Sequence, residues 1–191
     1  MKYLIAGLGN IGEEYKNTRH NIGFQILDAL TEASNISFKD RRYGWIAEFK
    51  YKARTYILLK PSTFMNLSGR AVNYWLQKEK IPVSKLLVLV DDVALPFGTV
   101  RLRAKGGPGG HNGLNNISDV LGRNDYARLR FGIGSDFHPG FQVDFVLSEW
   151  SPEEQKQLSE KMDTCIEMIK SFGVLGVERT MNLYNKKSKN A

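Results

Sequence analysis

The chain has 191 residues, 42% hydrophobic and 25% charged, with a formal net charge of +7 at pH 7. This composition is that of a globular domain and excludes a disordered chain, and no stretch approaches the roughly 20 apolar residues of a membrane-spanning helix. The first residues are too briefly apolar for a secretory leader, and the only cysteine, Cys165, excludes a disulfide framework and a thiolate metal site. We therefore expect a cytoplasmic protein that does not act at a membrane.

The basic charge is concentrated in part of the chain. Residues 98–131 hold six basic residues against two acids, whereas 148–180 hold seven acids against four bases. The last eleven residues add three lysines and no acid. A local basic excess fits a polyanionic partner such as a nucleic acid, although a solubilising surface would give the same composition.

Strands and helices are predicted to alternate along the chain. Short apolar runs predict buried strands, apolar residues three and four apart predict helices, and capping residues and prolines mark helix ends. In chain order the predicted elements are a strand over 2–7, a polar segment over 10–20, a helix capped by Asn21, a hairpin of 43–50 and 55–60, a helix over 66–80, strands over 86–90 and 99–103, a helix over 112–121, strands over 129–133 and 143–147, a helix capped by Ser151 that runs to about 172, and a helix over 174–184.

This alternation predicts an α/β fold, a single-domain three-layer sandwich whose mixed, mostly parallel sheet is flanked by helices. The domain is expected to span 1–185, with 186–191 as a basic, flexible tail. Active sites of such folds gather beyond the carboxyl ends of the strands. Asn10 and Asp91 both follow such ends, so this edge of the sheet is the expected site.

The segment 7–12 matches the G-x-G-x-x-G pattern of dinucleotide-binding turns. That pattern requires a helix to open at the glycines and meet a pyrophosphate, but polar residues with two glutamates follow here. A nicotinamide oxidoreductase is therefore the less favoured interpretation. The favoured one is a tight turn that exposes Asn10, whose side chain both donates and accepts hydrogen bonds, and a purely structural turn asparagine is the alternative.

His20 is the candidate catalytic base. The chain has three histidines, and His138 lies in a predicted exposed turn. No two of them have the H-x-x-x-H spacing that would indicate a zinc site. A carboxylate bonded to one ring nitrogen leaves the other free to accept a proton, and Asp91 can supply it. Since no G-x-S-x-G nucleophile occurs and Cys165 lies in a predicted helix, the expected reaction is direct hydrolysis by water, with an ester as target. In the alternative interpretation both residues are purely structural: His20 is a packed histidine, and Asp91 belongs to a turn or a helix cap.

Two further asparagines, Asn66 and Asn112, stand at predicted helix starts. They are either helix caps or members of an amide-lined site that reads peptide groups and stabilises an oxyanion. On the strand over 99–103, Arg101 and Arg103 share one face, and Lys105 continues it. This row is suited to contact phosphates, or it is a solvated face.

A series of short segments with a fixed order and spacing spans most of the chain. The segments are 7–10 (GLGN), Tyr15, 18–23 (TRHNIG), 60–61 (KP), 64–69 (FMNLSG), 91–92 (DD), 95–96 (LP), 109–114 (GGHNGL), 128–134 (RLRFGIG) and 146–148 (VLS). Together they resemble the bacterial peptidyl-tRNA hydrolase family. Ile11 stands where the family usually has proline, and Val93, Ala94 and Phe97 also depart from it, but no catalytic side chain is lost.

The resemblance implies an α/β enzyme that hydrolyses the ester between a peptide, or an N-blocked aminoacyl group, and tRNA. Such an enzyme recycles tRNA in translation and ribosome rescue. The resemblance also implies that His20 activates water without a covalent intermediate and that Asp91 supports its basic form. Asn10 would help to separate N-blocked substrates from ordinary aminoacyl-tRNA.

The same resemblance implies how the tRNA is bound. The peptide and the 3′ end would contact Tyr15, Phe64, Asn66 and Asn112. The phosphates of the acceptor stem would contact Arg101, Arg103 and Lys105. The family is typically monomeric and metal-independent, so we expect no cofactor and no obligate protein partner. The rival interpretation is a catalytically inactive RNA-binding relative of the same fold.

Overall fold

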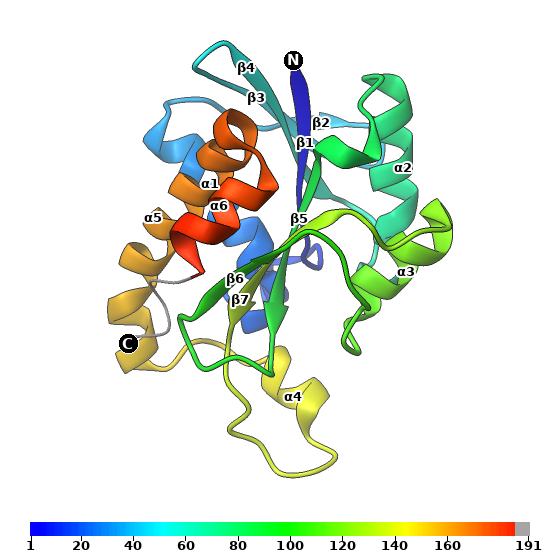
Figure 1. The fold of residues 1–191 in the computed structure, drawn as a ribbon. Helices are drawn as coiled ribbons and strands as arrows, with labels where there is room; N and C mark the ends of the chain where they lie inside the picture. The colour runs from blue at the N-terminus through cyan, green and yellow to red at the C-terminus, as the bar shows by residue number, and fades with distance from the viewer. Residues whose placement is uncertain (186–191) are drawn as a thin grey trace.

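The computed structural model describes residues 1–185, so the predicted tail 186–191 lies outside the described residues. One seven-stranded sheet, in the order β2-β3-β4-β1-β5-β7-β6, forms the middle layer (Figure 1). The four central strands are parallel, namely β4 (Arg54–Pro61), β1 (Lys2–Gly7), β5 (Leu86–Asp92) and β7 (Ala127–Gly132). The outer strands pair antiparallel, namely β2 (Lys39–Arg41), β3 (Gly44–Tyr51) and β6 (Val100–Arg103). The predicted mixed sheet is confirmed, with its parallel pairing at the centre.

Helices cover both faces of the sheet, as the three-layer prediction requires (Figure 1). One face carries α1 (Ile22–Ala33), α5 (Pro152–Leu175) and α6 (Val177–Tyr184), and the other carries α2 (Ser68–Lys78) and α3 (Asn112–Leu121). The central strand β5 buries Leu87 and Leu89 against the first group and Val88 and Val90 against the second. This two-sided burial explains its continuous apolar run. No helix within residues 1–185 combines the length and the apolar character that crossing a membrane requires.

The segment 143–147 is helical, and its prediction as a strand was wrong. It belongs to α4 (Gln142–Val146), which lies beyond the carboxyl edge of the sheet (Figure 1). Alternating Val143, Phe145 and Leu147 matches the period of a strand, but periodicity alone cannot separate a short apolar run in a helix from one in a strand. In the helix, Val143 and Val146 are three residues apart and line the same cleft.

The hairpin and the capped helix start are confirmed. Lys52 and Ala53, at the tip between β3 and β4, have φ angles of 47° and 61°, as a tight two-residue turn requires. Ser151 Oγ accepts the N–H of Glu154 at 3.2 Å, and the Ser151 N–H donates to Glu154 Oε1 at 2.8 Å. This reciprocal pair is a capping box that fixes the start of α5. The helix ends at Leu175 rather than near 172.

Helix α1 lies unusually close to the sheet because Gly23 faces the end of β1. A methyl group on Gly23 would lie 2.6 Å from the carbonyl oxygen of Leu8 and 2.7 Å from that of Leu89. Both atoms are backbone, so the space cannot be opened by a side-chain rotation. The 3₁₀ helix η2 (Arg19–Asn21) leads directly into α1, and the glycine contact therefore sets how close η2 lies to the end of β5.

Gly23→Ala is expected to lower the free energy of unfolding by about 1–3 kcal/mol, because a methyl group there forces backbone segments apart. Urea denaturation followed by circular dichroism measures the loss. Gly107→Ala is the matched control, since a methyl group at Gly107 would meet nothing within 4 Å. Equal stability of the two variants would mean that the close approach of α1 to the sheet is not needed.

Candidate active site

A cleft of about 720 Å³ opens beside the carboxyl ends of β1 and β5. Its walls come from segments that are far apart in the sequence, including η2, the turn before α2, the glycine-rich loop (106–110) before α3, and α4. The lining residues are Asn10, His20, 64–66, 91–93, 108–112, Arg130, Gln142, Val143, Val146 and Leu147. The site therefore lies at the edge of the sheet where the strand pattern predicted it.

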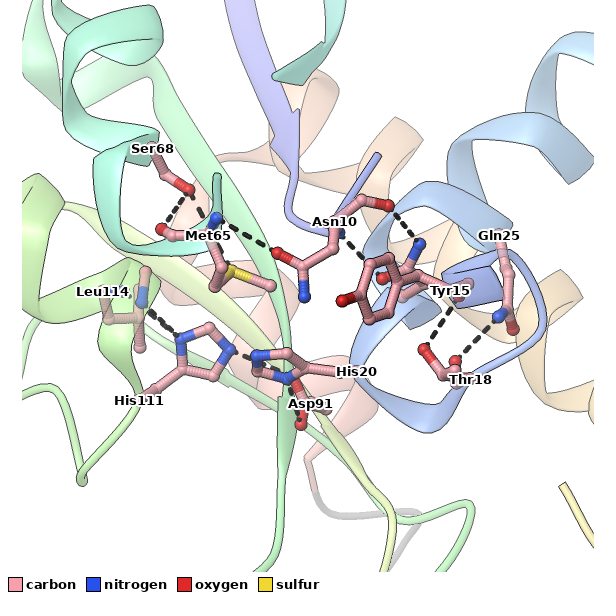
Figure 2. Close-up of polar contacts among 12 residues, drawn as sticks. Asn10, Tyr15, Thr18, His20, Gln25, Met65, Ser68, Asp91, His111 and Leu114 are labelled. Atoms are coloured by element: carbon pink, nitrogen blue, oxygen red, sulfur yellow. Dashed lines mark hydrogen bonds and ion pairs between the residues drawn. The ribbon is translucent and has the colours of Figure 1, made fainter. Parts of the chain in front are cut away.

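His20 and Asp91, 71 residues apart in the chain, are in direct contact (Figure 2). Nδ1 of His20 lies 2.9 Å and 3.0 Å from the two carboxylate oxygens of Asp91. An ionised carboxylate only accepts hydrogen bonds, so Nδ1 carries the proton and donates it. Nε2 of the neutral ring then keeps its lone pair, in a side chain that lines the cleft. The pair has the geometry of a base and the carboxylate that orients it.

His111 also contacts Asp91, and sequence reasoning assigned it no role. Its Nε2 lies 3.0 Å from Oδ1 of Asp91, the oxygen that also faces His20. Its Nδ1 accepts the backbone N–H groups of Gly113 at 3.1 Å and Leu114 at 3.3 Å. His111 is therefore the N-cap of α3, and the neighbouring Asn112 is not. The position of a histidine just before a predicted helix was the available signal.

Asp91 is ionised although its side chain is only 3% exposed. Burial by itself raises the pKa of this carboxyl group. In their protonated forms, the positive charges of His20 and His111, together with the hydrogen bonds from both rings, outweigh burial and hold the pKa of Asp91 well below its ordinary value. An anionic Asp91 stabilises the positive charge that His20 acquires when it takes up a proton.

Ligand atoms of His20, Asp91 and His111 lie within 4.8 Å of one another, which is close enough to consider a metal ion. The hydrogen bonds of His111 decide against one. Because its Nδ1 accepts two N–H groups, the proton of the neutral ring sits on Nε2, which then has no lone pair for an ion. The donor set fits a proton-bearing cluster better than a metal centre.

Asn10 is held in one orientation at the cleft. The buried Asn21 side chain accepts the Asn10 N–H at 2.9 Å and donates to its carbonyl oxygen at 2.9 Å, so Asn21 secures this turn and does not cap α1 as predicted. Oδ1 of Asn10 accepts the N–H of Met65 at 3.1 Å. Nδ2, the donor end of the amide, consequently points toward His20 (Figure 2).

The glycines at 7–12 do not lead into an α-helix, which a dinucleotide site would need. Gly7 ends β1, a loop and the 3₁₀ helix η1 (Glu13–Tyr15) follow, and α1 begins only at Ile22. The turn instead presents Asn10, in line with the favoured interpretation of this motif.

The other residues predicted to bind the peptide and the 3′ end surround Asn10 and His20. Phe64 is 66% exposed at the rim of the cleft, and Asn66 and Asn112 are exposed lining residues. Tyr15 is half-buried beside Asn10 (Figure 2), but it is not among the residues that line the cleft. The cleft thus combines an aromatic rim with several amides.

The residues predicted to contact phosphates lie on and after the edge strand β6. Arg103 and Lys105 are exposed, whereas Arg101 is half-buried and donates to the carbonyl oxygen of Asn185 at 2.8 Å. Arg130, on the neighbouring strand β7, lines the cleft, and its Nη1 lies 3.6 Å from Oδ2 of Asp92. The basic residues thus extend from the cleft to the edge of the sheet.

Arg128 forms hydrogen bonds to the backbone at the start of the glycine-rich loop. Its side chain is fully buried. The guanidinium donates hydrogen bonds to three backbone carbonyl oxygens, those of Gly106 at 2.7 Å, Gly107 at 3.1 Å and Asn124 at 2.7 Å. A buried cation that depends on backbone carbonyls keeps that backbone in place, because releasing it would leave the charge without partners. The loop is therefore fixed at its start, beside the residues that lead to His111.

A family model described as peptidyl-tRNA hydrolase matches residues 4–191. The chain is 61% identical over 187 residues to the peptidyl-tRNA hydrolase of Phocaeicola vulgatus, with 98% of this chain and 100% of the relative covered. It is 58% identical to that of Porphyromonas gingivalis, with 97% and 100% covered. A crystal structure of peptidyl-tRNA hydrolase from Acinetobacter baumannii matches with a TM-score of 0.89 at 33% identity, covering 96% of this chain and 94% of that one. The chain therefore belongs to the peptidyl-tRNA hydrolase family.

Proposed function

We propose that this protein hydrolyses the ester bond between the peptide and the tRNA of peptidyl-tRNA and so recycles tRNA from prematurely released peptidyl-tRNA. The observation that carries the proposal is the contact of His20 with Asp91 beside the donor amide of Asn10, in a member of this family. The cleft also has the exposed aromatic and amide side chains that a peptide and an RNA end would contact.

In the proposed reaction, Nε2 of His20 takes a proton from a water molecule as the water oxygen attacks the ester carbonyl carbon. The carbonyl oxygen becomes an oxyanion, which the amide N–H groups of Asn10 and Asn66, two residues that line the cleft, would stabilise. The bond between the carbonyl carbon and the ribose oxygen then breaks, and the ribose oxygen takes the proton from His20. The products are intact tRNA and a peptide with a free carboxylic acid, which releases its proton to solvent and becomes a carboxylate, and no covalent intermediate forms.

Selection of an N-blocked substrate follows from the same residues. A peptide presents an uncharged amide where an aminoacyl group presents an ammonium, and the neutral amide of Asn10 suits the former. Tyr15, Phe64, Asn66 and Asn112 would contact the peptide and the 3′ end. We further propose that the protein acts as a cytoplasmic monomer that needs no protein partner, metal or cofactor.

The acceptor stem would lie along β6, where phosphates meet Arg103 and Lys105, with Arg101 beside them. Arg103→Ala combined with Lys105→Ala is expected to raise KM, leave kcat nearly unchanged and lower the slope of log affinity against log salt by about 2. Filter binding of tRNA from 50 to 300 mM salt measures the slope. Lys50→Ala with Lys156→Ala, at exposed positions away from the cleft, is the control. An unchanged slope in the first variant would place the stem elsewhere.

The decisive assay is incubation with N-acetyl-aminoacyl-tRNA and measurement of released tRNA. Release by the purified protein, with much slower hydrolysis of unblocked aminoacyl-tRNA, is expected. Binding of tRNA without release would instead favour a catalytically inactive RNA-binding relative of the same fold.

A further inference from the structure

Both ring nitrogens of His111 form hydrogen bonds, and the two nitrogens have different partners. Nδ1 accepts two backbone N–H groups at the start of α3, at 3.1 Å and 3.3 Å. The neutral ring must therefore carry its proton on Nε2, which lies 3.0 Å from Oδ1 of Asp91. The side chain is only 8% exposed, so the backbone of α3 fixes His111 as a hydrogen-bond donor to Asp91.

Asp91 thus divides its acceptor capacity between two histidines. Oδ1 faces Nδ1 of His20 at 2.9 Å and Nε2 of His111 at 3.0 Å. A carboxylate that receives a second N–H donor has its negative charge partly stabilised, and it then supports a positive charge on the first partner less strongly. The low pKa of Asp91 is consistent with stabilisation from both sides.

The other charged groups at this point of the cleft do not supply the same effect. From β5 and β7 they are Asp92 and Arg130, which lie 3.6 Å apart and offset each other's charge. From η2 the facing group is His20 itself, and from the start of α3 it is His111. Besides His20 itself, His111 is the side chain that contacts the carboxylate of Asp91 by a hydrogen bond among the described residues.

We propose that His111 is a positioning residue that, by sharing Asp91 with His20, lowers the pH range over which His20 becomes free to accept a proton. The proposal rests on the proposed function, because it concerns the base of that reaction. Without the His111 donor, Asp91 would hold the protonated form of His20 more strongly. The enzyme would then need a more alkaline solution to reach its full rate.

Two substitutions separate this role from helix capping. In His111→Asn the amide oxygen replaces Nδ1 and can still cap α3, but no group reaches Asp91 in place of Nε2. In His111→Gln the longer amide can place an N–H near the position of Nε2, while the cap is lost. The pair therefore removes one interaction of His111 at a time.

The experiment is the pH dependence of kcat/KM for N-acetyl-aminoacyl-tRNA from pH 5 to 9. We expect the midpoint of the acid limb to move up by about half to one pH unit in His111→Asn. The midpoint should stay near the wild-type value in His111→Gln, whose melting temperature should fall instead. His138→Asn, in an exposed turn, is the matched control and should leave the profile unchanged. The same midpoint in all the proteins, or equal shifts in both His111 variants, would overturn the proposal.

A second measurement needs no substitution. In ¹⁵N-detected NMR of the wild-type protein, the neutral ring of His111 should carry its proton on Nε2 and none on Nδ1, because Nδ1 accepts the backbone N–H groups of Gly113 and Leu114. The opposite tautomer would overturn the proposal even if the variants failed to fold. This measurement also separates it from the proposed function, which would fail by a lack of turnover in the wild-type enzyme.

Discussion

His20→Ala is expected to lower kcat for N-acetyl-aminoacyl-tRNA by about 10²- to 10⁴-fold, the usual contribution of a general base. Alanine removes Nε2 of His20, the nitrogen that has a free lone pair because Asp91 holds the proton on Nδ1. The binding of tRNA should remain nearly intact, because the residues proposed to contact phosphates lie on and after β6. Single-turnover kinetics measure the first effect and filter binding the second.

His138→Ala controls for the loss of an imidazole, since His138 is exposed and is not among the cleft residues. It should retain the wild-type rate. A His20→Ala enzyme that keeps more than about a tenth of the wild-type rate would rule out His20 as the general base. A large loss of tRNA affinity would show that His20 acts mainly in binding.

Asp91→Asn should reduce kcat to a similar extent, by about 10²- to 10⁴-fold. The amide can donate to Nδ1 of His20 and favour the tautomer that has its proton on Nε2, which can no longer accept one. The amide also carries no charge to support a protonated ring. Asp92→Asn, at the adjacent carboxylate, is the matched comparison and should lose less than about tenfold. Equal losses would remove the special role assigned to Asp91.

Asp91 should also make folding stability depend on pH. Its pKa in the folded protein is below its ordinary value, so its contribution is complete above the unfolded pKa, near 3.9, and is lost as the pH falls through the lower folded value. The stability difference between wild type and Asp91→Asn should therefore be largest near neutral pH and shrink below about pH 4. Urea denaturation at pH 7 and pH 3 tests the sign, and a difference that grew on acidification would contradict it.

The parts of the fold that follow from local patterns were predictable. The apolar run of β5 indicated a strand buried on both faces, and the order of strands and helices indicated that Asn10 and Asp91 lie at the carboxyl ends of strands in one sheet. The contact between His20 and Asp91 followed from chemical reasoning on residue types and from the family resemblance. Its geometry depends on the packing of Gly23 against the sheet, which sequence patterns do not describe.

The features that were missed depend on long-range contacts. His111 and Asn21 each have a common local explanation, and their distant partners, Asp91 and Asn10, become visible only in the folded chain. The buried Arg128 looked like one more basic residue, although it bonds the backbone of the glycine-rich loop. Helix α4 was taken for a strand because five residues are too few to separate the two periods.

The pH dependence of kcat/KM in the wild-type enzyme tests the central claim, that a neutral His20 accepts the proton of the attacking water. Imidazole is the side chain whose charge ordinarily changes between pH 5 and 8. With N-acetyl-aminoacyl-tRNA as substrate, the rate should rise with pH across this interval and then level off. A rate that is flat from pH 5 to 8 would contradict the account.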